Sequence, residues 1–327
     1  MKHISILVPQ GAILGSIEGP RLVFSEVNAL LRRMGKPALF VIQLVGLSQA
    51  TAVCGGRYTI APDALLPEVT ETDLVIIPAV DGSLTEALEN NRELLPWIVE
   101  RYRGGAEVAS LCLGAFLLAA TGLITGRQCT THWAAAPKFR RMFPAVELLE
   151  DRLITDEHGI YSSGGAFSYL NLVLYLIEKY VNREMAVFCA KVFQIDMERV
   201  SQSAFVVFNG QKEHEDEPIK KAQAYIETNY REKISVDQLA SMLALGRRNL
   251  ERRFKKATSN SVVEYIQRVK MEAAKNSLES SRDNVTEVMY NVGYTDPKAF
   301  RLTFKRITGL SPKQYRSKYQ REAAVPA

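Results

Sequence analysis

The final third of the chain contains an internal repeat of about 50 residues, and this repeat limits the possible folds more than any other feature. One copy begins at Ser235 and the other at Asn284. Matching positions lie 49 apart early in each copy and 50 apart later, so one extra residue falls in between. The matched pairs are Val236 and Val285, Leu239 and Val288, Leu243 and Val292, Leu250 and Phe300, Phe254 and Phe304, Lys255 and Lys305, Thr258 and Thr308, and Tyr265 and Tyr315. Such a repeat is one supersecondary motif built twice.

Each copy predicts a helix, a tight turn and a second helix. Ser235 is a good N-cap, and apolar residues follow it at helical spacing up to Phe254. In the second copy, Gly293 is placed to end one helix, while Asp296 and Pro297 are placed to begin the next. A helix-turn-helix motif presents its second helix to the major groove of DNA, so the repeat predicts two DNA-reading helices.

The second helix of each copy carries residue types that bind DNA. Lys and Arg bind phosphates, whereas Arg, Asn and Glu pair with the edges of guanine, adenine and cytosine. A solvated helix face, or contact with phosphates alone, is the alternative for each residue. The predicted DNA-binding residues are Arg247, Arg248, Asn249, Glu251, Arg252 and Lys255 in the first copy and Lys298, Arg301 and Lys305 in the second.

Charge is distributed unevenly along the chain. From Pro218 onward there are 22 Lys and Arg against 11 Asp and Glu, whereas the preceding residues include 19 basic and 25 acidic ones. A basic C-terminal third favours an anionic polymer as its partner. The polar segment NGQKEHEDEP, at 209–218, has the composition of a linker. We therefore predict domains at 1–208 and 219–327, joined by residues 209–218.

Residues 219 to 319 resemble the DNA-binding domain of the AraC/XylS family of bacterial transcription regulators. The resemblance is carried by NVGYTDPKAFRLTFKRITGLSPKQYR, through Gly293, Tyr294, Phe300, Phe304, Lys305, Gly309, Pro312 and Tyr315. It implies that two helix-turn-helix units enter successive major-groove segments, with two boxes about one helical turn apart. It also implies RNA polymerase as a partner. The base-reading faces that it implies are Arg248, Glu251 and Arg252 in the first unit and Lys298, Ala299 and Arg301 in the second, which depends more on phosphates.

The first two thirds of the chain predict an α/β domain with a parallel, flavodoxin-like sheet. Continuous apolar strands are expected at 3–9, 40–46, 73–80 and 107–112, and helices at Arg21–Met34, Asn90–Arg103, 166–181 and REMAVFCAKVF. Alternating strands and helices favour a parallel sheet with both faces covered. The segment VCGGRYTI is expected to form a short hairpin. The predicted fold class is therefore this α/β sandwich, followed by an all-α domain with two helix-turn-helix units.

Cys112 lies at the predicted carboxyl end of a strand, where ligand sites in such sheets occur. The run SLCLGAF has the layout of a nucleophile elbow, and the helix that follows favours a thiolate. Ser163 and Gly164 precede another helix and can offer a hydroxyl and an N–H group to an anionic ligand. The other cysteines lack pairing or metal-ligand spacing, which favours a reducing, cytoplasmic setting. Those expected only to pack are Cys54, Cys129 and Cys189.

Residues 3 to 195 resemble the class I glutamine-amidotransferase-like superfamily of the PfpI type, in the branch that is fused to AraC/XylS DNA-binding domains. The resemblance rests on the Cys112–Gly114 elbow, on GLITGRQCTTHW and on EGPRLVFSEVN. It implies a domain that senses a ligand and dimerises. The candidate ligand-binding residues are Glu18, Cys112, Leu113, His132, Trp133, Ser163 and Gly164.

A complete catalytic set is not evident around Cys112. PfpI-type peptidases have a His directly after the Cys, where this chain has Leu113; His132 is the histidine left to act as a base, and Glu18 is the nearest carboxylate. We therefore expect no enzyme, with Cys112 and His132 as vestigial catalytic candidates. By the resemblance, the effector is a small metabolite such as an amino acid or a quaternary amine. The alternatives are a cysteine-dependent amidase or hydratase tethered to a DNA-binding domain, and a redox sensor that uses Cys112.

The remaining features predict neither a membrane protein nor a metalloprotein. No apolar run is long enough to span a bilayer, and the N-terminal apolar stretch fits a buried strand better than a signal peptide. No metal or cofactor is predicted. The expected protein is a cytoplasmic homodimer, paired through its N-terminal domain, that binds double-stranded promoter DNA and a small-molecule effector. The effector, the target genes and the choice between activation and repression stay open.

Overall fold

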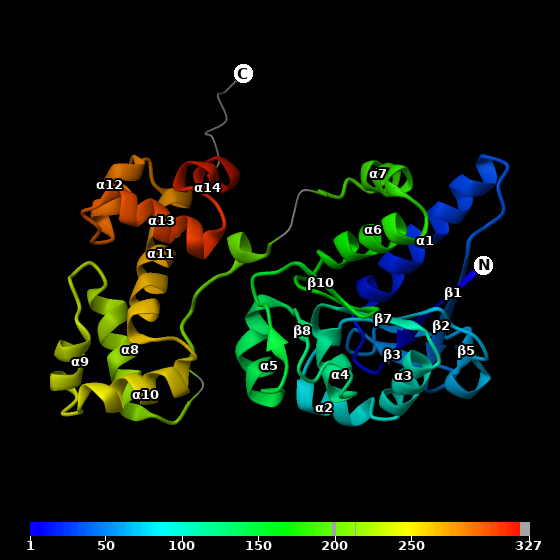
Figure 1. Cartoon of the computed structure of the whole chain (residues 1–327), viewed down its shortest axis with the longest axis horizontal. Coiled ribbons are helices and arrows are strands. Elements are labelled where there is room, and N and C mark those ends of the chain that lie inside the picture. The colour runs from blue at the N-terminus through cyan, green and yellow to red at the C-terminus, as the bar shows by residue number, and fades with distance from the viewer. Residues whose placement is uncertain (198–200, 213, 321–327) are drawn as a thin grey trace, which may run out of the picture. The chain divides into compact units, whose positions relative to one another are not determined.

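The structure is a computed structural model that describes residues 1–197, 201–212 and 214–320. It divides into two units, Met1–Gln202 and Ser203–Ala327. The first contains a sheet covered by helices, and the second consists of helices (Figure 1). The predicted fold class, α/β followed by all-α, is confirmed.

Seven strands form a mostly parallel sheet in the first unit. Their spatial order is β10-β11-β7-β6-β1-β2-β5, and β10 runs antiparallel to β11 whereas the other described pairs are parallel. Buried apolar residues fill the central strands, as in parallel sheets covered on both faces. The strands are β1 (Lys2–Val8), β2 (Phe40–Gly46), β5 (Ala64–Leu65), β6 (Leu74–Ile77), β7 (Glu107–Leu111), β10 (Ile154–Glu157) and β11 (Ile160–Ser163).

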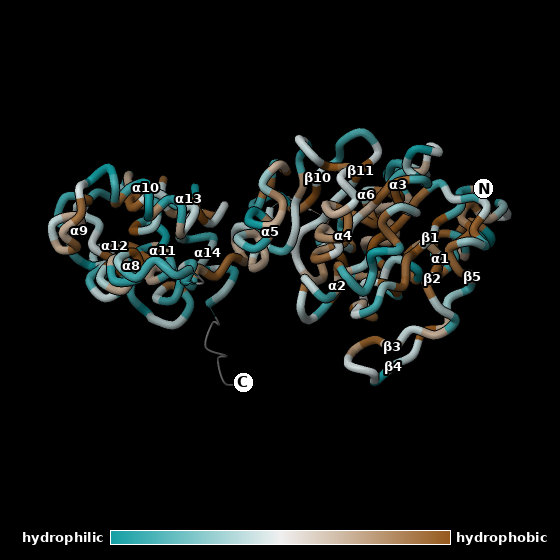
Figure 2. The backbone as a smooth tube through the Cα atoms, turned by 90° about the horizontal axis from the view of Figure 1, so that it is seen from below, coloured by the Kyte–Doolittle hydropathy of each residue, from teal (hydrophilic) through white to brown (hydrophobic). Residues whose placement is uncertain are grey.

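Helices cover both faces of this sheet (Figure 1). One face packs against α1 (Leu14–Arg33), α6 (Tyr169–Tyr180) and α7 (Arg183–Val192). The other packs against α2 (Leu84–Asn90), α3 (Leu94–Arg103), α4 (Ala115–Ala120) and α5 (Ala136–Met142). Figure 2 shows that the hydrophobic residues concentrate in the strands and in the helices packed on them. Two small strand pairs complete the unit, β3 (Thr51–Val53) with β4 (Tyr58–Ile60) and β8 (Gln128–Cys129) with β9 (Glu147–Leu148).

Two predicted helices have different bounds in the structure. The helix predicted over Arg21–Met34 begins at Leu14, and the turn at Gly19 lies so close to α6 that a Cβ there would be 2.6 Å from the hydroxyl of Tyr169. The helix predicted over Asn90–Arg103 begins only at Leu94, as α3, because α2 ends at Asn90 and the side chain of Asn91 turns inward between the two helices. Its buried amide accepts a hydrogen bond from the N–H of Gln10 at 2.8 Å and donates one to the carbonyl of Gln10 at 3.0 Å.

The predicted hairpin is confirmed as β3 and β4, but the prediction that Cys54 packs in the interior is wrong. Cys54 lies at the turn of the hairpin, where it is exposed and has a φ of 53°. Cys129 and Cys189 are buried, as predicted. A tight two-strand turn leaves no interior in which Cys54 could be enclosed.

The second unit contains seven described helices around two small cores. Tyr265 of α11 belongs to one core and Leu278 to the other, so this long helix joins the two halves. Each core includes one predicted helix-turn-helix: α9 and α10 contribute to the first core, and α12 and α13 contribute to the second. The helices are α8 (Glu217–Asn229), α9 (Val236–Met242), α10 (Arg247–Thr258), α11 (Val262–Ser280), α12 (Val285–Asn291), α13 (Pro297–Thr308) and α14 (Pro312–Tyr319).

The two halves repeat in detail as well as in outline. The turn between the helices contains a left-handed residue in each half, Ala244 with φ 52° and Gly293 with φ 73°. The hydroxyl of Thr258 donates to the carbonyl of Phe254 at 2.8 Å, and Thr308 makes the same bond four residues back at 2.8 Å. These matching bonds mean that α10 and α13 end in the same way.

The division between the units falls after Gln202, earlier than the boundary predicted at residue 208. The carbonyl of Val206 accepts a hydrogen bond from Lys275 at 2.6 Å, and the ring of Phe208 packs on that of Tyr265 with centroids 5.1 Å apart. Several residues of the predicted linker 209–218 also make contacts within the second unit, such as Lys212, which pairs with Glu227 at 2.7 Å. Polar composition indicates a segment outside a hydrophobic core, but composition does not tell with which unit such a segment packs.

Candidate functional site

The exposed face of α10 has an arrangement that suits DNA reading. Arg252 donates to the side-chain oxygen of Asn249 at 3.0 Å, which orients its guanidinium on the outside of the helix. Arg248 is exposed, and within the described ranges it has no ion pair or hydrogen bond from its side chain. Arg247 instead pairs with Asp237 at 3.1 Å and with Glu251 at 3.3 Å. Two arginines are therefore available at the surface, whereas Arg247 and Glu251 must first exchange their partners.

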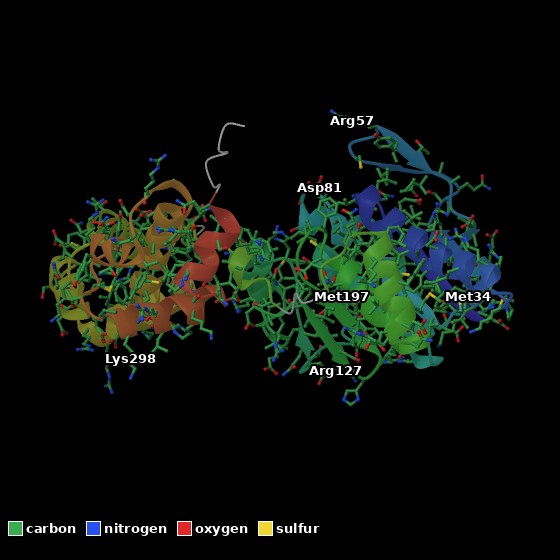
Figure 3. The ribbon with its side chains drawn as sticks, turned by 90° about the horizontal axis from the view of Figure 1, so that it is seen from above. Met34, Arg57, Asp81, Arg127, Met197 and Lys298 are labelled. Atoms are coloured by element: carbon green, nitrogen blue, oxygen red, sulfur yellow. The ribbon has the colours of Figure 1, made fainter. Side chains whose placement is uncertain are left out.

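The equivalent face of α13 is basic but sparser. Lys298, Arg301 and Lys305 are exposed, and none of the three has a side-chain partner among the residues that the structure describes. The side chain of Lys298 extends outward from the helix (Figure 3). Ala299 is partly buried, so it is a weaker candidate for contact with DNA. On α10, Lys255 lies 3.9 Å from Glu264, a loose pair that a phosphate could displace.

Leu302 lies between these cations and was missed by the sequence analysis. It is 62% exposed, and it stands 50 positions after Arg252 in the repeat. Comparing the outward positions between the matched pairs Leu250/Phe300 and Phe254/Phe304 is the signal that could have found it. The face of α13 thus has an apolar centre where α10 has an arginine.

Cys112 occupies a strained elbow in the first unit. It follows β7, has a φ of 53° and is 4% exposed. The sharp turn brings the next residues against the neighbouring strand, where a Cβ on Gly114 would lie 2.5 Å from the carbonyl oxygens of Ile77 and Pro78. The hydroxyl of Thr131 donates to the carbonyl of Cys112 at 2.9 Å. The predicted elbow geometry is therefore present, and it requires glycine at position 114.

The electrostatics around Cys112 differ from the prediction that the following helix favours a thiolate. Burial raises the pKa of the Cys112 thiol to about 11, and the N–H of Leu113 offsets only part of this effect. Helix α4 is six residues long and contributes a short dipole. The thiol is therefore neutral near pH 7, which makes it a poor nucleophile.

The predicted partners of Cys112 are engaged elsewhere. His132 caps the turn at Trp133–Ala135, since its Nδ1 accepts from the N–H of Ala134 at 3.2 Å, and burial lowers the pKa of the ring. Its partly buried ring lies beside that of Trp133, with centroids 5.3 Å apart. Glu18 is paired with Arg21 at 2.5 Å on α1. Within the described residues, neither His132 nor Glu18 makes a hydrogen bond to Cys112.

Ser163 and Gly164 do lie beside the elbow. Ser163 pairs with Leu111 in the register of β11 and β7, one residue before Cys112. The side chain of Ser163 is fully buried, and its Oγ has no hydrogen-bond partner in the described part of the chain. An unpaired buried hydroxyl costs about 1–3 kcal/mol, so a ligand that pairs with it gains that free energy.

Gln202 holds the loops around this edge together and was also missed by the sequence analysis. It is 2% exposed, and its amide nitrogen donates to the carbonyls of Thr131 at 2.9 Å and Arg152 at 3.2 Å. Its amide oxygen accepts from the N–H of Trp133 at 3.2 Å. A Cβ on Gly164 would lie 2.4 Å from the Gln202 amide nitrogen, so the amide packs directly on the glycine. No local pattern marks this residue, because its partners are distant in sequence.

A separate hollow of about 330 Å³ opens beyond the ends of β1, β2 and β6. Its lining is polar and includes Gln10, Ser48, Asp81 and Glu86, and Figure 3 labels Asp81 at this edge. In the described residues there is no group of three or more His, Cys, Asp or Glu side chains that could hold a metal ion. None of the helices described has both the length and the apolar character that crossing a membrane requires.

Comparisons with known proteins agree with this two-unit architecture. A family model described as "Helix-turn-helix domain" matches residues 239–318, and one described as "DJ-1/PfpI family" matches residues 23–179. The HTH-type transcriptional regulator GbdR of Pseudomonas aeruginosa is 26% identical over 264 residues, which are 79% of this chain and 69% of GbdR. The HTH-type transcriptional regulator GlxA of Rhizobium meliloti is 23% identical over 214 residues, 64% of this chain and 65% of GlxA.

Solved structures share a large part of this fold. A protein from Vibrio parahaemolyticus aligns with a TM-score of 0.52 at 21% identity, over 58% of this chain and 98% of its own. A THiJ/PfpI family protein from Pseudomonas syringae aligns with a TM-score of 0.50 at 16% identity, over 82% of this chain and 88% of its own.

The duplicated helix-turn-helix, its basic faces and the separate α/β unit define a DNA-binding transcription regulator. Its relatives carry that function in their names. More particularly, the chain combines an N-terminal region that the DJ-1/PfpI model matches with a C-terminal helix-turn-helix domain of the AraC type.

Proposed function

We propose that this regulator binds promoter DNA through α10 and α13 and that a small metabolite bound in the first unit controls it. The observation that carries the DNA role is the repeat, which presents Arg248 and Arg252 on one second helix and Lys298, Arg301 and Lys305 on the other. Two helices of this kind on one chain favour an asymmetric site with two boxes about one helical turn apart.

The effector site that we propose lies at the carboxyl end of β7, beside Cys112, Leu113 and Ser163. The buried hydroxyl of Ser163 supports it, since this group gains a hydrogen bond only when something else binds there. The neutral thiol of Cys112 suits contact with an uncharged part of the ligand. The resemblance to the AraC/XylS regulators of this type implies a small nitrogenous metabolite, such as an amino acid or a quaternary amine, and this is the first class of effector to test.

A route from this site to the end of the first unit supports control by the effector. Thr131 binds the carbonyl of Cys112 with its hydroxyl, and its own carbonyl accepts from Gln202. Gln202 is the last residue of the first unit. A ligand changes function only if it binds two states unequally. We propose that those states differ in whether the Gln202 amide keeps its hydrogen bonds to Thr131 and Trp133.

We propose that the first unit does not catalyse a reaction. A cysteine hydrolase needs a base within hydrogen-bond reach of the thiol, and His132 uses its Nδ1 as a helix cap. Turnover of amide or isonitrile substrates that disappears in a Cys112→Ser variant would support the enzyme alternative. DNA binding that responds to oxidant through Cys112 would support the redox alternative.

We further propose that the protein acts as a homodimer in the cytoplasm and contacts RNA polymerase at its promoters. Dimerisation through the first unit would bring a second DNA-binding unit to the same promoter and raise its effective concentration there. Sedimentation of the full chain and of its complex with DNA tests this assembly.

The experiment that tests the function is selection of genomic fragments by the purified full-length protein, followed by sequencing. We expect enrichment of sites with two boxes about one turn apart, and an absence of enriched sites overturns the DNA role. The selected DNA then serves to screen amino acids and quaternary amines for a change in affinity. Ser163→Ala should remove that response and leave DNA binding intact, whereas Asp81→Ala, in the separate hollow, should keep both. The reverse result would move the effector site to the hollow.

A further inference from the structure

We infer that Leu302 recognises the methyl group of a thymine in the box bound by the second helix-turn-helix unit. This inference rests on the proposed DNA-binding function and assigns the second unit a specificity that its basic residues do not provide. It starts from an exposed leucine, 62% accessible, in a helix that otherwise presents cations.

Leu302 lies on the outer side of α13. The core side of the helix is defined by Phe300, Phe304 and Thr308, which are buried. At 100° per residue, position 302 points away from the mean direction of these three by nearly half a turn. Lys298 and Lys305 lie four residues before and three residues after it, on the same face.

The position is that of a base-reading residue in the other half. The repeat aligns Leu302 with Arg252, 50 positions earlier, on the outer face of α10. Because Thr258 and Thr308 fix the ends of the two helices through the same hydrogen bond, the two positions project equivalently from their units. A helix that docks like α10 therefore brings Leu302 to the base edges and its lysines to the flanking phosphates.

Charge selects the occupant of this surface. Lys298, Arg301 and Lys305 surround Leu302 and have no side-chain partners among the described residues, so the surface favours a polyanion. The major groove is polyanionic at its rim, and it offers an aliphatic group in one base, the C5-methyl of thymine. A protein partner that buries Leu302 would have to accommodate these three cations as well.

The test replaces single thymines with deoxyuridine in the selected DNA, which removes the methyl group and keeps the pairing. The full-length protein should lose about fourfold in affinity at one thymine of one box, the value expected for one buried carbon. Leu302→Ala should lose a similar factor on unmodified DNA and show no further loss with deoxyuridine. Val263→Ala, which removes another exposed apolar side chain, from α11, should behave as the wild type.

Three results would overturn the inference without touching the proposed function. One is a selected site in which the box of the second unit contains no thymine; this box is the one that Arg252→Ala leaves unaffected. Another is a Leu302→Ala variant that keeps the full deoxyuridine effect. The third is unchanged DNA affinity of that variant together with lost transcription in a purified system, which would assign Leu302 to a protein partner. If no genomic site is enriched at all, the proposed function itself fails first.

Discussion

Replacing Gln202 with alanine should destabilise the first unit markedly, although the residue is the last one before the division. The change leaves the carbonyl of Thr131 and the N–H of Trp133 without a partner, whereas the carbonyl of Arg152 keeps the hydroxyl of Thr130 at 2.8 Å. Buried polar groups without partners cost about 1–3 kcal/mol each when dry, and some of them will recruit water. Adding the lost packing of the side chain on Gly164, we expect a loss of about 3–4 kcal/mol in the free energy of unfolding.

The assay can report on the first unit within the intact chain. The protein contains two tryptophans, Trp97 and Trp133, and both belong to the first unit. Tryptophan fluorescence in a denaturant series therefore follows that unit while the second contributes no tryptophan signal. A loss of this size lowers the melting temperature by about 10 °C for a domain of some 200 residues.

Two companion variants separate hydrogen bonding from packing. Gln202→Glu keeps the shape but places carboxylate oxygen beside the two carbonyls, so it should destabilise at least as much as Gln202→Ala. Gln128→Ala makes the same truncation at an exposed residue and should change stability by less than about 0.5 kcal/mol. A Gln202→Ala variant within about 1 kcal/mol of the wild type would refute the view that this amide holds the edge together.

Further predictions concern the elbow and the DNA face. Gly114→Ala should cost about 1–3 kcal/mol or more, because its Cβ meets two carbonyl oxygens at 2.5 Å, whereas Gly15→Ala, with its nearest contact at 3.8 Å, should be almost neutral in the same denaturation assay. Since the pKa of Cys112 is raised to about 11, only about one thiol in a thousand is ionised at pH 8. Mass-resolved alkylation should therefore modify the exposed Cys54 first, and the rate at Cys112 should keep rising up to about pH 11; rapid modification of Cys112 at pH 7 would contradict this. Arg252→Ala should weaken specific binding by about 1–3 kcal/mol and relax one box in a binding series, and a uniform loss across sequences would instead make Arg252 a phosphate contact.

The sequence predicted the parts of the molecule in which local pattern and global fold agree. Long apolar strands such as Phe40–Gly46 follow from continuous hydrophobicity, and the helix-turn-helix units follow from a repeat whose caps and core positions recur. The short strands β10 and β11 escaped prediction, since four-residue runs that are half polar or more, ITDE and IYSS, have little local signal. β11 forms because β7 offers an edge to pair with, and β10 pairs in turn with β11, which are tertiary effects.

The sequence predicted the location of the candidate site better than it predicted the contacts among the site residues. Cys112, Ser163 and Gly164 do meet at one edge of the sheet, because strand ends in a parallel sheet share an edge. Glu18 and His132 carry suitable groups, but each is satisfied by a near neighbour in sequence, Arg21 or Ala134. Residue type alone does not show whether such a local partner has already taken the group.

The strain at Cys112 connects these observations. A non-glycine residue with positive φ persists only where its surroundings hold it, and here the hydroxyl of Thr131 and the tight passage at Gly114 do so. A purely structural turn would reach the same shape at lower cost with glycine in place of Cys112. On the proposed function the cysteine side chain contacts the effector at this edge, and its neutral thiol favours contact with a ligand over attack on one. On this view the unpaired hydroxyl of Ser163 binds the ligand, and the hydrogen-bonded amide of Gln202 responds to that binding.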